Sequence, residues 1–170
     1  GRLVDLRLPI VAGAAIEIVT SKDPQGGEVI RHSAEHVMAD AVKRLFPDVQ
    51  IDVGRTDHSE KFQYDFLVSR AFTTDDLERI GAEMRKILAE KSAFERREVS
   101  REEAKALFAS MGEELKVARI DDIPGGDAIT LFSHGSFTDL CRGPHVQRAD
   151  QIGAVKLLEV AGAYWKGDES

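Results

Sequence analysis

The sequence lacks most of the features that mark secreted or membrane proteins. It has one cysteine among 170 residues, so no disulfide can form within the chain and the Cys141 thiol should be reduced. No apolar run approaches the ~20 residues that span a bilayer, and the N-terminus lacks the layout of a signal peptide. Internal repeats and low-complexity segments are also missing. We therefore expect a cytoplasmic protein without membrane contact.

Positive charge is scarce as well. The 23 Lys and Arg residues are outnumbered by 30 Asp and Glu residues, which gives a formal net charge of -7 with neutral histidines. This balance argues against a broad grip on nucleic-acid phosphates but leaves room for a local contact with one RNA end. The hydrophobic content of 42% and the charged content of 31% are typical of a soluble globular chain. The chain begins with Gly1 and not Met, which indicates a piece of a longer protein.

The apolar pattern predicts three helices and a larger number of short strands. A helical period runs from Glu28 to Pro47, and further helices are expected after the capping residues Thr73 and Ser100. Strand-like runs occupy residues 3–6, 15–19, 50–53, 62–68, 94–99, 115–120, 129–132, 137–140 and 155–160. Their irregular alternation with helices predicts an α+β fold, with a largely antiparallel sheet packed with helices.

A loop-like segment near the N-terminus indicates a domain boundary. Residues 21–27 read Ser-Lys-Asp-Pro-Gln-Gly-Gly, a composition typical of a linker. We place one unit at 1–25 and a second at 26–170. Two short strands are marginal alone, so we expect residues 1–19 to pack on the larger unit or to be mobile.

Two pairs of soft or borderline metal ligands stand out. His32 and His36 are four apart in a predicted helix, so both imidazoles lie on one face. Cys141 and His145 are also four apart, but Pro144 between them would cost about 3 kcal/mol inside a helix, so this segment reads as a loop. We expect the helix to face the loop in the folded chain, so that one thiol and three imidazoles converge. Such a group suits zinc binding or the activation of a water molecule.

Each pair taken alone has a simpler explanation. Two histidines at helical spacing are often incidental, and a lone Cys141 is often a small buried hydrophobe. Segment 32–36 also matches the H-x-x-E-H pattern of inverted zinc proteases, in which the glutamate is the base. Because the second ligand pair is better, we expect Glu35 to be a solvated helix residue. We also expect His58 and His134 to be surface histidines.

Four blocks of the sequence resemble the amino-terminal editing domain of bacterial-type threonyl-tRNA synthetases. In chain order they are Arg31 to Ala39, Phe62 to Phe66, Asp139 to Val146, and Ala161 to Asp168. Residues 1–20 resemble the second half of the small β-grasp (TGS) module that precedes that domain. The resemblance departs at 53–64, which lacks the usual Gly-Pro and Gly-Phe-Tyr-Tyr. The aminoacylation domain is missing from this sequence, so we expect the chain not to charge tRNA.

The resemblance implies post-transfer editing, the hydrolysis of the ester in seryl-tRNA(Thr). Serine lacks only one methyl group of threonine, and a pocket distinguishes the two by about 1–3 kcal/mol, so a second hydrolytic site must remove the error. The implied partners are the 3' end of tRNA(Thr) carrying serine and the remainder of the synthetase.

The resemblance and the chemistry together give the expected site. One of the three imidazoles is the natural base or water-positioning group, because imidazole titrates near neutrality. The family places a lysine matching Lys116 in the editing site. The expected catalytic residues are His32, His36, Lys116, Cys141 and His145, and the expected substrate-binding residues are Tyr64, Asp139 and Arg142. No metal is required in this view, although zinc is possible on His32, His36, Cys141 and His145.

Two other functions remain open. An alanyl-type trans-editing domain has a similar fold and similar ligand pairs and binds zinc. That type usually reads Cys-Gly-Gly-Thr-His, whereas this chain has Cys-Arg-Gly-Pro-His at 141–145. The other function is that of a non-catalytic RNA-binding or metal-storage module.

Overall fold

The computed structural model describes residues 1–162 of the chain. Along the chain lie α1 (Pro24–Leu45), β1 (Gln50–Gly54), β2 (Tyr64–Leu67), α2 (Thr74–Glu90), β3 (Phe94–Val99), α3 (Arg101–Ser110), α4 (Glu114–Asp122), β4 (Ile129–His134), β5 (Phe137–Leu140) and a short 3-10 helix, η1 (Ala149–Ile152). None of these described helices combines the length and the apolar character needed to cross a membrane.

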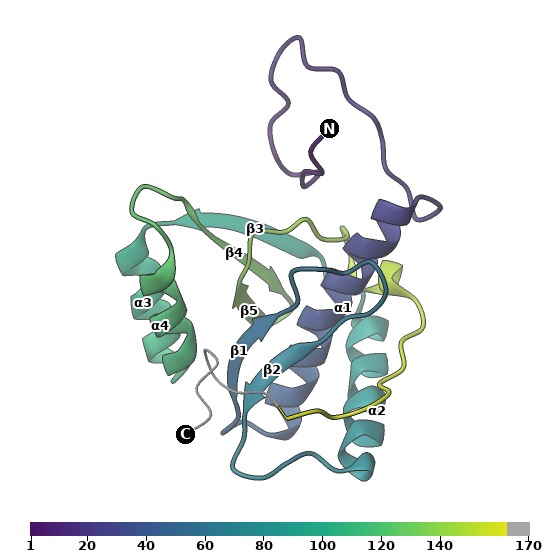
Figure 1. The fold of residues 1–170 in the computed structure, drawn as a ribbon, viewed down its shortest axis with the longest axis vertical. Helices are drawn as coiled ribbons and strands as arrows, with labels where there is room; N and C mark the ends of the chain where they lie inside the picture. Colours follow the sequence, from purple (N-terminus) through teal and green to yellow (C-terminus); the bar gives the residue numbers. More distant parts are fainter. Residues whose placement is uncertain (163–170) are drawn as a thin grey trace.

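The strands form two antiparallel sheets. β1 pairs with β2, and β3, β4 and β5 pair in that order in a three-stranded sheet. Figure 1 shows α1 behind the β1–β2 hairpin with α2 beside it, while α3 and α4 pack together on the other side of the molecule. The predicted α+β class, with antiparallel sheets packed with helices, is confirmed.

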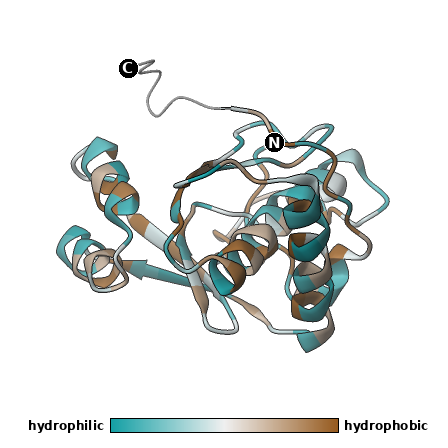
Figure 2. Cartoon of the chain, turned by 90° about the horizontal axis from the view of Figure 1, so that it is seen from below, coloured by the Kyte–Doolittle hydropathy of each residue, from teal (hydrophilic) through white to brown (hydrophobic). Residues whose placement is uncertain are grey.

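Two apolar clusters hold these elements together. The larger joins α1, α2 and the β1–β2 hairpin to Phe94 and Phe137, and the smaller joins α3, α4 and β4 through Phe108 and Ile120. Figure 2 shows the α3–α4 pair standing apart from α1 and α2. The candidate site takes side chains from α1, β2, α4, β5 and the segment after β5, so both clusters position it.

Helix α1 begins inside the segment expected to be a linker. Pro24 lies in its first turn, where a missing N–H is harmless and the fixed φ suits a helix. Gly26 follows within the helix, because a Cβ atom there would lie 1.9 Å from the Thr20 carbonyl oxygen. Proline and glycine thus mark the start of this helix and its close approach to the preceding turn.

Four of the predicted strands are wrong. Residues 115–120 were expected to be extended because leucine, valine and isoleucine suit strands, but they lie in α4. Ile120 is fully buried against Ala104 and Phe108 of α3, so tertiary packing decides in favour of the helix. The other three, at 3–6, 15–19 and 155–160, find no partner strand among the described residues, and unpaired strands are not stable. Most of the resembling block at 161–168 lies outside the described residues.

Candidate functional site

Two pairs of side chains from distant parts of the chain meet in a small polar group, the His–Cys cluster. His32 and His36 lie on α1, and Cys141 and His145 lie in the segment after β5. Cys141 Sγ is 3.2 Å from His32 Nε2 and 3.2 Å from His145 Nε2. One ligand atom of each of the four residues lies within 4.8 Å of the others. The predicted meeting of helix and loop is confirmed.

The loop at 141–145 depends on Gly143 for its shape. Gly143 has φ +72°, in the left-handed region that favours glycine. A Cβ atom at this position would also lie 2.7 Å from Cζ of Phe132. Glycine is therefore needed for both conformation and space, and the turn returns His145 to the side of Cys141.

Hydrogen bonds outside the His–Cys cluster select the imidazole tautomers. Ser33 Oγ donates to the Val29 carbonyl at 2.7 Å, so it accepts from His145 Nδ1 at 3.1 Å. The Pro144 carbonyl can only accept, so His32 Nδ1 donates to it across 3.2 Å. Both rings carry hydrogen on Nδ1 and turn an unprotonated Nε2 to the thiol. Metal-binding histidines commonly have this arrangement.

Burial keeps the His–Cys cluster uncharged near neutral pH. It lowers the pKa of His32 to about 4 and that of His36 to about 3. It also lowers the pKa of His145 well below the ordinary value. Burial raises the pKa of the Cys141 thiol to about 12, so the sulfur keeps its proton when no metal is bound.

A second buried group, the Lys116 trio of Tyr64, Lys116 and Asp139, borders the His–Cys cluster. Lys116 Nζ is 2.6 Å from Asp139 Oδ1 and donates to the Tyr64 hydroxyl at 2.8 Å. The Tyr64 hydroxyl in turn donates to Asp139 Oδ2, which lies 3.8 Å from His36 Nδ1. An ammonium group has three N–H bonds, so Lys116 keeps one for a water molecule or a substrate oxygen.

The charges of the Lys116 trio are settled by their mutual contacts. Burial alone would raise the pKa of Asp139, but Lys116, His36 and the hydrogen bonds of the trio lower it. Burial and the neighbouring carboxylate both raise the pKa of Tyr64 well above its ordinary value. The trio therefore contains a carboxylate and a neutral phenol.

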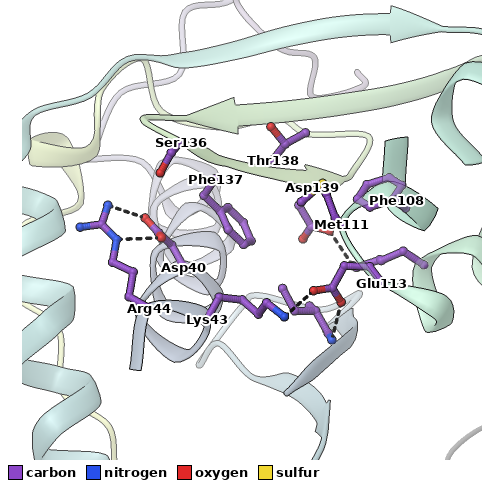
Figure 3. Close-up of a pocket in the computed structure, with 12 residues that line it drawn as sticks. Asp40, Lys43, Arg44, Phe108, Met111, Glu113, Ser136, Phe137, Thr138 and Asp139 are labelled. Atoms are coloured by element: carbon purple, nitrogen blue, oxygen red, sulfur yellow. Dashed lines mark hydrogen bonds and ion pairs between the residues drawn. The ribbon is translucent and has the colours of Figure 1, made fainter. Parts of the chain in front are cut away.

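A cavity of about 220 Å³ reaches the Lys116 trio from the side of α3 and β5. Lys116 and Asp139 line it, but none of the four His–Cys cluster residues does. Figure 3 shows the Phe137 ring among the charged side chains of this cavity, with Arg44 bound to Asp40 and Lys43 bound to Glu113. The cavity therefore reaches the Lys116 trio through Lys116 and Asp139 and does not reach the His–Cys cluster.

Two residues dismissed on sequence grounds lie beside the His–Cys cluster. Glu35, expected to be solvated, is 1% exposed and accepts from the backbone N–H groups of Arg55 at 3.2 Å and Gln63 at 3.0 Å. His58, expected on the surface, lies with Nε2 3.0 Å from Glu35 Oε1, and its ring centroid is 4.6 Å from that of His32. Both expectations are wrong. The sequence did contain one indication that Glu35 lies beside the cluster. His32 and Glu35 are three residues apart, which puts them on neighbouring parts of one helical face.

His134 is also buried and not at the surface. It is 1% exposed, and its ring contacts Phe94 and Phe137. Its Nδ1 atom is 3.8 Å from Asp40 Oδ2. The expected strand ended at residue 132, whereas β4 continues to His134 and carries it into the interior.

Arg142 is the one predicted site residue whose side chain lies away from the cluster. It is largely exposed, and its guanidinium is 3.4 Å from the Asp127 carboxylate. The structure brings the other seven predicted residues into the two adjoining groups, His32, His36, Cys141 and His145 in one and Tyr64, Lys116 and Asp139 in the other.

Known proteins carry the same sequence pattern. Residues 129–170 match the family model described as "Threonyl and Alanyl tRNA synthetase second additional domain". The chain is 48% identical over 169 residues to a threonine-tRNA ligase of Geobacter sp. (strain M21) and 49% identical over 168 residues to that of Methylococcus capsulatus. Each match covers 99% of this chain and 26% of the ligase. The resemblance to the editing region of threonyl-tRNA synthetases is confirmed.

The family model and the ligases match different parts of the site. The threonyl- and alanyl-type model covers β4, β5 and the Cys141–His145 loop, whereas α1 with His32 and His36 lies outside it. The threonyl-type ligases match along almost the whole chain, including that of Symbiobacterium thermophilum, which is 46% identical over 170 residues. The chain spans about a quarter of the length of these ligases.

The His–Cys cluster fits a metal ion by its chemistry. Imidazole nitrogen and thiolate sulfur are the ligands that zinc prefers, and four of them make a tetrahedral set. Two of the imidazoles already present unprotonated Nε2 atoms to the thiol. His32, Glu35 and His58 make a second, overlapping group of possible ligands.

Proposed function

We propose that this chain hydrolyses the ester of seryl-tRNA(Thr) and spares threonyl-tRNA(Thr). The observation that carries the proposal is the junction of an uncharged imidazole cluster with a buried ammonium group that has an N–H to spare. Residues 26–170 would form the editing unit of a cytoplasmic threonine-tRNA ligase, and residues 1–25 the end of its TGS module. The rest of that enzyme would supply most of the grip on tRNA.

Ester hydrolysis needs a positioned water molecule, a group that takes its proton, and stabilisation of the developing oxyanion. We assign the water molecule to the imidazoles of His32 and His36. Neutral imidazole nitrogen accepts a hydrogen bond from water, and the depressed pKa of about 4 for His32 suits positioning better than early proton transfer. As the water molecule attacks the ester carbonyl, its proton would pass to one of these imidazoles and from there to the leaving ribose oxygen, so that the ester bond breaks into serine and free tRNA.

We assign the oxyanion to Lys116. Two of its N–H groups are directed to Asp139 and Tyr64, and the third would donate to the water molecule or to the carbonyl oxygen as it gains charge. Asp139 and Tyr64 then hold the ammonium in place, and Asp139 also faces His36. Arg142, which is exposed within the Cys141–His145 loop, would contact the RNA.

We propose that the reaction does not require a metal. Zinc, when bound by His32, His36, Cys141 and His145, would polarise a substrate oxygen or activate a water only if one protein ligand left. Four ligands close a tetrahedral site, which is typical of structural zinc. The Cys141 thiol would instead contribute a polar contact next to the imidazoles.

The test is single-turnover deacylation of seryl-, alanyl- and threonyl-tRNA by the whole chain, with and without a strong chelator. We expect release of serine from threonine tRNA at the same rate in chelator, with threonine retained. Lys105→Met, at a half-buried lysine of α3 that pairs with the exposed Asp121, is the matched control and should keep full activity. Intact seryl-tRNA together with release of alanine from alanine tRNA would indicate the alanyl-type function. No deacylation of any substrate would indicate a binding module, and loss in chelator with stoichiometric restoration by zinc would show an obligatory metal.

A further inference from the structure

The N-terminal segment makes one buried contact. Most of residues 1–23 are exposed, yet Asp5 is only 3% exposed. Its Oδ1 atom accepts from the backbone N–H of Arg7 at 3.0 Å and from Arg7 Nη1 at 2.9 Å. Asp5 and Arg7 thus form a local ion pair, and its buried side faces the Cys141–His145 loop.

This ion pair holds the backbone at His145, a member of the His–Cys cluster, and at Val146, the next residue. Asp5 Oδ2 accepts from the backbone N–H of His145 at 3.0 Å. Arg7 Nη2 donates to the carbonyl oxygen of Val146 at 3.1 Å. The Arg7 guanidinium also lies 6.0 Å from the centroid of the Phe132 ring, which contacts the His145 ring edge-on at 4.5 Å. Backbone and ring of His145 are therefore both linked to the N-terminal segment.

The loop is held from α1 on its other side. Ser33 Oγ accepts from the Val146 N–H at 3.0 Å and from His145 Nδ1, and His32 Nδ1 donates to the Pro144 carbonyl. Hydrogen bonds with a charged partner are the stronger kind, and those from the N-terminal segment are of that kind. Removing them would leave Pro144, His145 and Val146 hydrogen-bonded to α1 alone, although Cys141 would keep its bond to Thr130 of β4.

We propose that Asp5 and Arg7 are positioning residues of the site, and that they clamp the Cys141–His145 loop from the N-terminal segment. Residues upstream of the predicted boundary at 21–27 thereby help to set where His145 points. The coupling is reciprocal, because anything that binds at His145 in the clamped geometry also strengthens docking of residues 5–7. That Asp5 and Arg7 hold the loop does not depend on what the chain does. That they affect catalysis rests on the proposed function.

Cys141 is the only cysteine, so its alkylation by iodoacetamide reports on the loop without any assumption about function. The test uses the whole chain with Asp5→Asn or Arg7→Ala, and Glu17→Gln as the control, an exposed carboxylate of the same segment. We expect alkylation about tenfold faster in both clamp variants, the effect of losing a hydrogen bond to a charged group, and no change in the control. Equal rates in Asp5→Asn and the unmodified chain would overturn the proposal. Urea unfolding of each variant measures its loss of global stability. If that loss accounts for the whole increase in the alkylation rate, the proposal is also overturned.

Single-turnover deacylation of seryl-tRNA separates the catalytic part. Asp5→Asn should lower the rate constant at saturation about tenfold and leave the half-saturating protein concentration unchanged, because a misplaced catalytic group affects the chemical step and not binding. A change confined to the half-saturating concentration would overturn the catalytic part of the clamp. If the unmodified chain does not deacylate, the proposed function fails and the alkylation rates alone decide on the clamp.

Discussion

The His–Cys cluster and the Lys116 trio are neighbouring buried polar groups that are stabilised in opposite ways. In the His–Cys cluster, burial lowers the pKa of each imidazole and raises that of the thiol, so the side chains stay uncharged. In the Lys116 trio, Lys116 Nζ lies 2.6 Å from Asp139 Oδ1, and this contact opposes the effect of burial by lowering the pKa of Asp139. In the first group two Nε2 lone pairs face one thiol, whereas the second group has a spare N–H only on Lys116.

This difference separates a part that can react from a part that supports it. The Nε2 lone pairs of His32 and His145 share one thiol hydrogen, so at least one of them is available to water, substrate or metal. In the Lys116 trio, the loss of one partner would leave a buried charge unpaired. Substitutions in this group should therefore lower the free energy of unfolding strongly. Substitutions in the two groups should therefore fail in different ways.

The largest effect is expected from Lys116→Met. It leaves Asp139 buried without its ammonium partner, which should lower the free energy of unfolding by about 3–5 kcal/mol and abolish deacylation. Urea unfolding of Lys105→Met gives the matched comparison, since Lys105 pairs with the exposed Asp121 and should change stability by less than about 1 kcal/mol. A small effect at Lys116 would mean that Asp139 is not charged in the folded chain.

Next in size is His32→Ala, which should impair function more than folding. Loss of the imidazole that positions water should reduce the deacylation rate about 100-fold or more. Cys141→Ser keeps a polar group in the same place and should reduce the rate less than about tenfold, because serine is a poor zinc ligand but a good hydrogen-bond partner. Single-turnover rates compare the two. A larger loss in Cys141→Ser would assign the thiol, and with it a metal, to the reaction.

The His–Cys cluster and the Lys116 trio should lower the free energy of unfolding in different ranges of acid pH. The pKa of His32 is lowered to about 4, so between its ordinary value of 6.5 and about 4 the unfolded chain binds a proton that the folded chain does not. The free energy of unfolding should fall by up to about 1.4 kcal/mol per pH unit for each such histidine across that window. The lowered pKa of Asp139 acts only below its ordinary value of 3.8. Urea unfolding in chelator at about pH 7.5, 6 and 5 measures the slope, and His32→Gln should reduce it by one proton.

The smallest effect on the fold is expected from Arg142→Ala. Its side chain is exposed and pairs with Asp127 across 3.4 Å, so the free energy of unfolding should change by less than about 0.5 kcal/mol. If Arg142 contacts the RNA, the half-saturating concentration for seryl-tRNA should rise severalfold and its salt dependence should weaken. Unchanged binding at low salt would remove Arg142 from the proposed site.

The elements that could be predicted have a strong local pattern. The long period of α1 and the capping residues Thr73 and Ser100 of α2 and α3 are visible in the sequence, and both caps are present in the structure. Helix α4 is short, and its valine and isoleucine suit a strand equally well. Its helical state follows from packing of Ile120 on α3, which a local pattern does not contain.

The same division applies to the site. Spacing on a helix and a Gly-Pro turn were enough to predict that His32 lies beside His36 and Cys141 beside His145, whereas the meeting of the two pairs depended on the expected fold. Glu35 and His58 were missed, because the loop of residues 55–63 has no periodicity and is held by hydrogen bonds to Glu35 and Arg31 of α1. The role of Lys116 could be expected only from the resemblance, since the contacts that bury its charge come from β2 and β5.

The sequence by itself determined the two ligand pairs, because four-residue spacing on one helix and in one turn is a local property of the backbone. Only the tertiary structure decided that the two pairs meet, and what their chemical state is. The pKa of an imidazole or a thiol depends on how much water is excluded and which charges stand nearby, and here the neighbours of the imidazoles come from α1, α4, β4, β5 and the N-terminal segment. Burial and long-range partners are properties of the folded chain. The His–Cys cluster and the Lys116 trio can therefore be told apart only in the folded structure.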